Sequence, residues 1–370
     1  MTHDLNFRLT ANETGETKCV VFVDSIKNAR EALFPHATSV VVAFPFIKAF
    51  GIQTHVHKLS DLSKVPCVTA IAPHTIASIN TNTQNQYLPQ QHLLPFTSYL
   101  LPQNAPAVAI IDTGLAPHLD FMLPNRVFFK DFISSKDTPY DDNGHGTAVA
   151  SILAGSGLCS GGKIKGVVPN QKIFALKAIG AKGEGGAFAI LEAMQWLYDN
   201  AKKHNIKVVC MSFGSPPVKD GQDALSIGAE ALWKQGIVVV ASAGNLGPDK
   251  DTIQSPGTNS FIITVGGVKI EGEKIEVAEF SSRGKGGKLT KPDLVAPAVN
   301  IAACGTTNLY QYFSGTSMAA PYVAGIILKL LEKHPTATPN KIKEILLNQA
   351  KPLPFLQEEV GRGLVVGLDE

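Results

Sequence analysis

The first 80 residues carry short runs of apolar and β-branched side chains that are typical of strands, and two stretches with helical spacing separate them. In chain order these elements follow one another as β-α-β-β-α-β, the unit of a ferredoxin-like α+β domain. The strand runs are KCVVFVD (18–24), SVVVAF (39–44), AFGIQTHV (49–56) and CVTAIA (67–72), and the helical stretches are SIKNAREALF (25–34) and HKLSDLSKV (57–65).

Residues 81–105 are rich in Asn, Gln and Pro, and this composition predicts little regular structure. The stretch is interpreted as a connector. It divides the chain into a small N-terminal domain, residues 1–80, and a larger domain, residues 106–370.

From residue 106 onward, near-continuous apolar strands alternate with amphipathic helices. This pattern indicates an α/β domain with a mostly parallel sheet that helices cover on both faces. Ligands of such sheets bind beyond the carboxyl ends of the strands. The predicted strands are 107–112, 172–179, 206–213, 236–243 and 261–267, and the predicted helices are 146–155, 185–204, 223–235 and 319–334.

Composition and charge exclude two classes of partner. The chain has 370 residues, of which 44% are hydrophobic, enough for one large domain and one small one. Its 33 basic residues nearly balance 31 acidic ones, and no basic stripe is interleaved with aromatics, so we expect no nucleic-acid partner. The longest apolar runs, such as 236–244, are too short to predict a membrane span.

The N-terminal residues and the cysteines favour the cytoplasm. The opening residues are polar and lack the apolar core of a signal peptide, although a secreted protein whose leader is missing would look the same. The five cysteines are scattered without a CxxC pair, which indicates reduced thiols rather than a disulfide framework. Cys210 and Cys304 are interpreted as small buried hydrophobes.

Four polar residues stand at the ends of predicted strands or at the starts of helices. Asp112 ends AVAIID, Asn245 ends VVVASAGN, His145 lies between two glycines, and Ser317 lies in GTS just before a helix. Each residue has a plain structural interpretation as a turn former or helix cap. As a set they are the groups that nucleophilic acyl transfer requires.

The chemistry assigns a role to each group. A serine hydroxyl is a poor nucleophile until an imidazole takes its proton, and a buried carboxylate must orient that imidazole. Asn245 and the backbone N–H of Ser317 are placed to stabilise the oxyanion. Among folds that carry this triad, the chain order Asp, His, Ser matches the subtilisin order.

Four segments resemble the signature blocks of the subtilisin-like serine proteases, the subtilases: AIIDTG, NGHGTAVASILAG, SAGN and GTSMAAP. The resemblance covers roughly residues 106–365. It implies a subtilisin-like three-layer domain and a serine endopeptidase that needs no cofactor. It assigns Asp112 as the triad acid, His145 as the general base, Ser317 as the nucleophile and Asn245 as the oxyanion donor.

The same resemblance implies a cleft that binds an extended peptide or protein substrate. IGAKGEGG (179–186) resembles the strand that pairs with the substrate backbone, and SFGS (212–215) resembles the opposite wall. Ordinary glycine-rich loops are the alternative interpretation of both segments. Gln254 falls near the expected pocket floor and leaves the side-chain preference open. The implied substrate-binding residues are Gly183, Glu184, Gly185, Ser212, Phe213, Gly214, Ala243 and Gly244.

The N-terminal domain resembles the propeptide that assists folding in many subtilases and then blocks the cleft with its tail. CVTAIAPHTIASIN (67–80) resembles that tail, so self-cleavage is expected near Asn80 and the domain is expected to act as an intramolecular inhibitor. A permanent partner-binding module is the alternative interpretation.

Three departures from the family pattern refine these expectations. The loop 155–166 has no Asp or Asn to ligate a cation, so we expect no metal there. The segment before Asp112 lacks the glycine-rich lead-in of the family. A propeptide without a signal sequence favours an intracellular processing or quality-control enzyme.

Asp141 and Asp142, just before the histidine block, are interpreted as loop carboxylates.

Two alternatives to the endopeptidase remain open at the level of sequence. One is a non-catalytic protein that captures peptides while its N-terminal domain stays clamped. The other is a dedicated peptide-maturation protease that cuts one leader, or ligates peptides rather than hydrolysing them.

Overall fold

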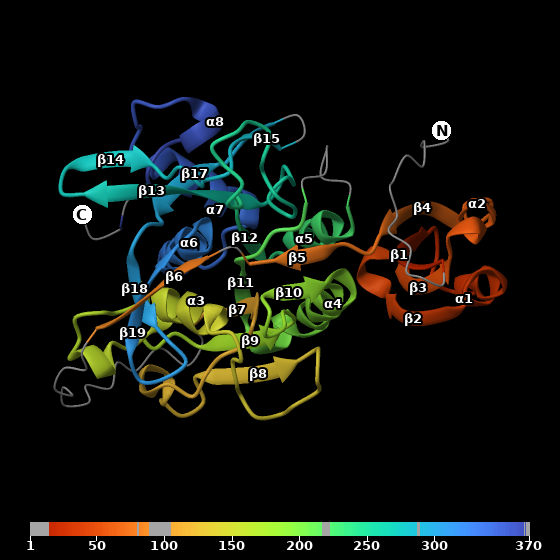
Figure 1. The fold of residues 1–370 in the computed structure, drawn as a ribbon, viewed down its shortest axis with the longest axis horizontal. Coiled ribbons are helices and arrows are strands. Elements are labelled where there is room, and N and C mark those ends of the chain that lie inside the picture. The colour runs from red at the N-terminus through yellow and green to blue at the C-terminus, as the bar shows by residue number, and fades with distance from the viewer. Residues whose placement is uncertain are drawn as a thin grey trace.

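A central sheet of eight strands organises the molecule (Figure 1). The computed structural model describes residues 15–79, 81–88, 105–216, 223–286, 289–365 and 367. The strands follow the order β14-β13-β12-β11-β7-β9-β8, and β17 also pairs with β13. All pairs are parallel except β13–β14. The bounds are β7 (Ala107–Asp112), β8 (Val127–Asp131), β9 (Ile173–Lys177), β11 (Ile206–Met211), β12 (Val238–Ser242), β13 (Ile263–Glu271), β14 (Lys274–Val277) and β17 (Leu294–Pro297).

Helices cover both faces of this sheet. Helices α3 (His145–Ala154) and α6 (Thr316–Lys333) pack together on one face, and α4 (Ala187–His204) and α5 (Ala224–Lys234) pack together on the other (Figure 1). The predicted mostly parallel sheet with helices on both sides is therefore confirmed. The remaining helices of the large domain are α7 (Pro339–Gln349), which packs on α6, and the short α8 (Gln357–Val360).

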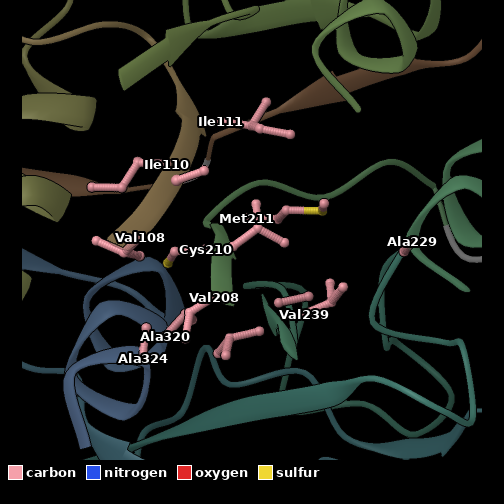
Figure 2. Packing of buried hydrophobic residues seen from close by; sticks show 14 of the residues in the cluster. Val108, Ile110, Ile111, Val208, Cys210, Met211, Ala229, Val239, Ala320 and Ala324 are labelled. Atoms are coloured by element: carbon pink, nitrogen blue, oxygen red, sulfur yellow. The ribbon is translucent and has the colours of Figure 1, made fainter. Parts of the chain in front are cut away.

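The core lies where the central strands meet the helices. Every residue of β7 is buried, because a strand covered on both faces has no side that reaches water. Figure 2 shows side chains of β7 and β11 packed beside Ala320 and Ala324 of α6. Since both strands end at the same edge of the sheet, this rigid centre fixes the residues that follow them.

The N-terminal residues form the predicted β-α-β-β-α-β order, with helices shorter than predicted. Their antiparallel sheet has the order β2-β3-β1-β4. One face packs on α1 and α2 around Leu33 and Leu62, and the other packs on the large domain, where the rings of Phe44 and Phe188 lie 6.2 Å apart. The elements are β1 (Glu16–Val23), α1 (Ala29–Leu33), β2 (Ser39–Phe44), β3 (Ala49–His55), α2 (Leu59–Leu62) and β4 (Val68–Pro73).

The prediction of little regular structure in the connector is wrong for its first part. Strand β6 (Asn82–Leu88) pairs antiparallel with β19 (Tyr310–Ser314), which in turn pairs with β18 (Ile301–Cys304). Pairing along a strand edge uses backbone groups, so a run of Asn and Gln can form it without apolar side chains. Residues 89–104 of the connector lie outside the described residues. One further small ribbon pairs β15 (Gly284–Gly286) with β16 (Leu289–Lys291).

No helix in the described ranges is both long enough and apolar enough to span a bilayer.

Candidate active site

Asp112 and His145 are in contact at the carboxyl end of β7. Oδ1 of Asp112 accepts a hydrogen bond from the N–H of Thr113 at 2.7 Å and lies 2.7 Å from Nδ1 of His145. Both side chains are almost fully buried. This contact orients the imidazole so that its Nε2 faces away from the carboxylate. A carboxylate in this position also stabilises the imidazolium form.

The loop before α3 places His145. Gly144 adopts φ 103°, a left-handed conformation that favours glycine, and His145 follows as the first helical residue. The carboxylate of Asp141 caps the helix: its Oδ1 accepts from the N–H of Gly144 at 2.8 Å, and its Oδ2 accepts from the N–H of Thr147 at 2.9 Å. Asp141 is a loop carboxylate, as interpreted from the sequence, and it holds the first turn of the histidine helix.

Ser317 lies in the first turn of α6, which begins three residues before the predicted start. Its Oγ donates to the carbonyl of Ser212 at 3.0 Å, and the Oγ of Ser212 donates to the carbonyl of Ser317 at 3.0 Å. Nε2 of His145 is buried and has no hydrogen-bond partner among the described residues. In the structure, Asp112 contacts His145, but the Ser317 hydroxyl donates its hydrogen bond to the backbone carbonyl of Ser212 and not to His145.

The sheet nevertheless brings the three residues to one place. Strands β7 and β11 are parallel neighbours, and Ile111 pairs with Met211. The next residues, Asp112 and Ser212, therefore stand side by side at the strand ends. Because Asp112 contacts His145 and Ser212 is bonded to Ser317, the base and the hydroxyl are anchored to adjacent strand ends.

Asn245 is oriented by the residue before Ser317. Its Oδ1 accepts two hydrogen bonds from Thr316, one from the N–H and one from the Oγ1 hydroxyl, both at 2.9 Å. Since the carboxamide is planar, its nitrogen points away from Thr316. An amide donor that is fixed in this way matches the requirement of an oxyanion hole.

A segment of the chain itself lies between the two predicted walls of the cleft. Strand β5 (Ile76–Ser78) pairs antiparallel with β10 (Glu184–Gly186), and the N–H of Ile79 donates to the carbonyl of Gly183 at 3.0 Å. On its other side, Ser78 exchanges two backbone hydrogen bonds with Gly214, at 2.8 and 3.0 Å. Figure 1 shows β5 running beside β10 into the large domain.

The predicted substrate-binding residues divide into two groups. Gly183, Glu184, Gly185 and Gly214 bind the backbone of the 75–79 segment directly. Ser212, Phe213, Ala243 and Gly244 are buried, and the carbonyl of Ser212 accepts a hydrogen bond from the Ser317 hydroxyl.

Lys177 is a buried cation that sequence reasoning missed. Its Nζ donates to the carbonyl of Thr113 at 2.5 Å, to the carbonyl of Ile179 at 3.0 Å and to Oδ1 of Asp142 at 2.7 Å. Lys177 therefore joins the residue after Asp112 to the loop that begins the His145 helix. The available signal was a lysine inside the apolar run KIFALKAI, since a lysine buried in a sheet requires polar partners.

Replacing Lys177 with methionine is expected to lower kcat/KM by about 10²-fold, because small displacements of catalytic groups have effects of this size. The side chains are similar in length, but methionine cannot hold the Thr113 carbonyl or Asp142. The measurement is kcat/KM against pH together with the melting temperature. Lys172→Met, at the residue directly before the same strand, is the control. A Lys177→Met enzyme with wild-type kcat/KM would rule out the positioning role.

A second cluster of buried polar side chains lies at the start of β19, around Tyr310. The carboxylate of Asp120 accepts from the N–H groups of Gly157 at 2.9 Å and Cys159 at 3.1 Å, and from the hydroxyl of Tyr310 at 2.9 Å. The potential ligand atoms of His118, Asp120 and Cys304 lie within 4.8 Å of one another. Protein donors already occupy the Asp120 oxygens, so we assign no metal to the cluster. Burial raises the pKa of the Cys304 thiol, in keeping with a small buried hydrophobe.

Comparison with known proteins defines the class. A model described as the subtilase family matches residues 103–363, and the chain belongs to this family. It is 38% identical over 268 residues to serine protease AprX of Bacillus subtilis (strain 168), a match that covers 65% of this chain and 60% of AprX. It is 34% identical over 249 residues to subtilisin DY of Bacillus licheniformis, which covers 66% of this chain and 84% of that protein.

The fold agrees with a solved structure of the same class. The crystal structure of fervidolysin from Fervidobacterium pennivorans, described as a keratinolytic enzyme related to subtilisin, superposes with a TM-score of 0.75 at 23% identity. The match covers 98% of this chain and 62% of that one. The α/β subtilisin-like fold is thereby confirmed. The chain spans about three fifths of the length of AprX and of fervidolysin.

Proposed function

We propose that the chain is a serine endopeptidase made as a self-processing zymogen, with Asp112, His145 and Ser317 as its triad and Asn245 in its oxyanion hole. The observation that carries the proposal is the 75–79 segment, which lies in the cleft as the middle strand between Gly183–Gly186 and Gly214. An extended chain held by backbone bonds on both sides is the geometry of a bound peptide.

The course of the chain beyond this segment supports self-cleavage. Ile79 and Thr81 both line a cavity of about 310 Å³ whose wall includes His145. The chain then continues as β6 along β19, the strand that leads to Ser317. The expected cleavage position, Asn80, lies between these two flanks and outside the described residues.

The N-terminal sheet supports an inhibitory role for the domain that precedes the cut. Oε1 of Gln195 in α4 accepts from the N–H of Phe46 at 3.1 Å, and the ring of His74 packs edge-on against Phe188 at 4.4 Å. Burial lowers the pKa of His74, so the imidazole is neutral in this contact at physiological pH. These contacts anchor the domain on α4 while its tail fills the cleft.

The reaction follows from the groups in place. The hydroxyl of Ser317 turns from the Ser212 carbonyl to Nε2 of His145, which takes its proton as Oγ bonds to the substrate carbonyl carbon. The carbonyl π electrons move to oxygen, where Asn245 and the Ser317 N–H stabilise the charge. The C–N bond breaks as His145 protonates the leaving amine. Water then repeats the sequence on the acyl-enzyme and releases the acid.

The proposal is tested by following the intact mass of the full chain after purification and by labelling it with a fluorophosphonate probe. We expect a cut after about residue 80 and a single adduct on the peptide that carries Ser317. The two readouts differ in what they require, because labelling needs an activated serine whereas the cut also needs the tail in the cleft.

A non-catalytic peptide-capturing protein is the second candidate, and one observation favours it. The Ser317 hydroxyl is bonded to Ser212, while Nε2 of His145 has no partner among the described residues. This candidate replaces the endopeptidase if the protein stays full length after purification and is not labelled, even once limited proteolysis has removed its first 80 residues.

An intracellular location is proposed from the five cysteines, all of which are free thiols.

A further inference from the structure

Strand β6 follows the cleft-bound segment 75–79 and pairs antiparallel with β19. Asn82 stands opposite Ser314, and Leu88 stands opposite Tyr310. The other edge of β19 is paired with β18, so β6 covers the second edge of this strand. Pairing along a strand edge uses backbone groups, which any extended chain can offer.

The edge of β19 leads to the proposed catalytic group. Ser314 ends β19, and Ser317 follows three positions later in α6. Phe313 of β19 lines the same cavity of about 310 Å³ as Thr81 and His145. The chain therefore passes His145 at Thr81 and joins β19 at the next residue. The edge of β19 thus holds the part of a bound chain that follows the proposed cut.

The proposed self-cleavage near residue 80 leaves this pairing intact. The cut breaks the link to the N-terminal domain, but it breaks no backbone hydrogen bond between β6 and β19, because both strands lie on the C-terminal side of the cut. Residues 89–106 still connect β6 to β7. A segment that is tethered to its site over a short connection has an effective concentration on the order of millimolar. The pairing is therefore intramolecular, and a substrate has to displace it.

We propose that β6 stays on β19 after self-cleavage and acts as a strap, residues 82–88, over the half of the cleft that follows the scissile bond. The N-terminal domain and its tail cover the half that precedes this bond. Activation then takes two events, the departure of the N-terminal domain and the displacement of the strap. The inference rests on the proposed endopeptidase function and adds a second level of regulation to it.

The strap distinguishes two kinds of substrate. A peptide p-nitroanilide has no residue after its scissile bond, so it does not need the edge of β19. A peptide that continues for several residues beyond the scissile bond competes with β6 for this edge. Because the competition is for binding, the strap raises the KM of the long peptide and leaves the KM of the p-nitroanilide unchanged.

The test disrupts the strap with the double substitution Gln84→Pro and Asn85→Pro. Neighbouring N–H groups of a strand point to opposite sides, so two adjacent prolines remove one donor to β19 in either register. Each enzyme is measured after self-cleavage and removal of the N-terminal domain. The double variant is expected to have a KM for the long peptide at least about tenfold below that of wild type. Gln90→Pro with Gln91→Pro, after the end of β6, is the matched control.

Release of the strap from the folded enzyme supplies a second measurement. A recognition sequence for a site-specific protease replaces residues 95–101, and cutting it turns β6 into a separate peptide. The KM for the long peptide is expected to fall by the same factor as in the double proline variant. A synthetic peptide of residues 81–88 is then expected to raise this KM again without affecting the p-nitroanilide.

Three outcomes separate the strap from the protease. If wild type is labelled by the fluorophosphonate probe at Ser317, but its KM for the long peptide is the same before and after disruption of β6, the strap is wrong while the protease stands. An equal gain on both substrates also contradicts the strap, because the effect would not act through the edge of β19. If wild type is neither labelled nor cut, the endopeptidase itself is wrong and the strap falls with it.

Discussion

Replacing Ser317 with alanine is expected to abolish self-cleavage and to lower kcat on peptides by at least about 10⁴-fold. In the proposed reaction the Ser317 hydroxyl oxygen bonds to the substrate carbonyl carbon, and alanine has no atom that can form this bond. The backbone N–H of residue 317 and Asn245 remain, so binding of extended peptides persists. The full chain is therefore expected to stay uncut, with its tail in the cleft.

The measurement is intact mass over time, combined with peptide turnover after the first 80 residues have been removed by limited proteolysis. Ser314→Ala is the matched control, because this serine lies three residues earlier and its Oγ accepts a hydrogen bond from the N–H of Asn300 at 2.9 Å. An alanine variant at 317 that still cuts its own chain would show that the nucleophile is elsewhere.

Replacing Asp112 with asparagine is expected to lower kcat by about 10⁴-fold while the protein stays folded. The amide has the shape of the carboxylate, and its oxygen would keep the place of Oδ1, which accepts from the N–H of Thr113 and contacts Nδ1 of His145. The NH₂ group would take the place of Oδ2, which has no hydrogen-bond partner among the described residues. The loss comes from the missing negative charge, which would stabilise the imidazolium during the proposed reaction, rather than from lost packing.

Turnover and melting temperature together check this expectation. Asp249→Asn, on an exposed loop, is the control for a change of charge alone. A melting temperature near that of wild type with a loss of turnover supports the role of the carboxylate charge. Retained turnover would mean that the 2.7 Å contact between Asp112 and His145 has no part in the reaction.

The order of elements could be predicted from the sequence because the strands are buried on both faces. A run such as AVAIID has no polar side, and only a covered parallel sheet accepts it. Asp112, His145, Ser317 and Asn245 could be placed for a related reason, since each ends an apolar run or starts a helix. Their mutual distances could not be predicted from either pattern.

Three features depend on contacts between distant segments and could not be predicted from the sequence. The strand at 82–88 forms because β19 offers an unpaired edge, which Asn and Gln side chains do not signal. The sequence around Lys177 does not identify its hydrogen-bond partners, Thr113 and Asp142, which come from other segments. A serine side chain can adopt three χ1 rotamers. Only the folded structure shows that the Ser317 hydroxyl donates to the carbonyl of Ser212.

The burial of both faces of the N-terminal sheet determines what would follow the proposed self-cleavage. One face rests on its own short helices, but Phe44 and Val20 on the other face are buried against the large domain. A domain of some 60 residues has little stability in reserve. Its departure would expose this second face to water, so leaving and unfolding are thermodynamically linked. If the domain is the proposed inhibitor, it would act only once, because it would lose its folded conformation on release.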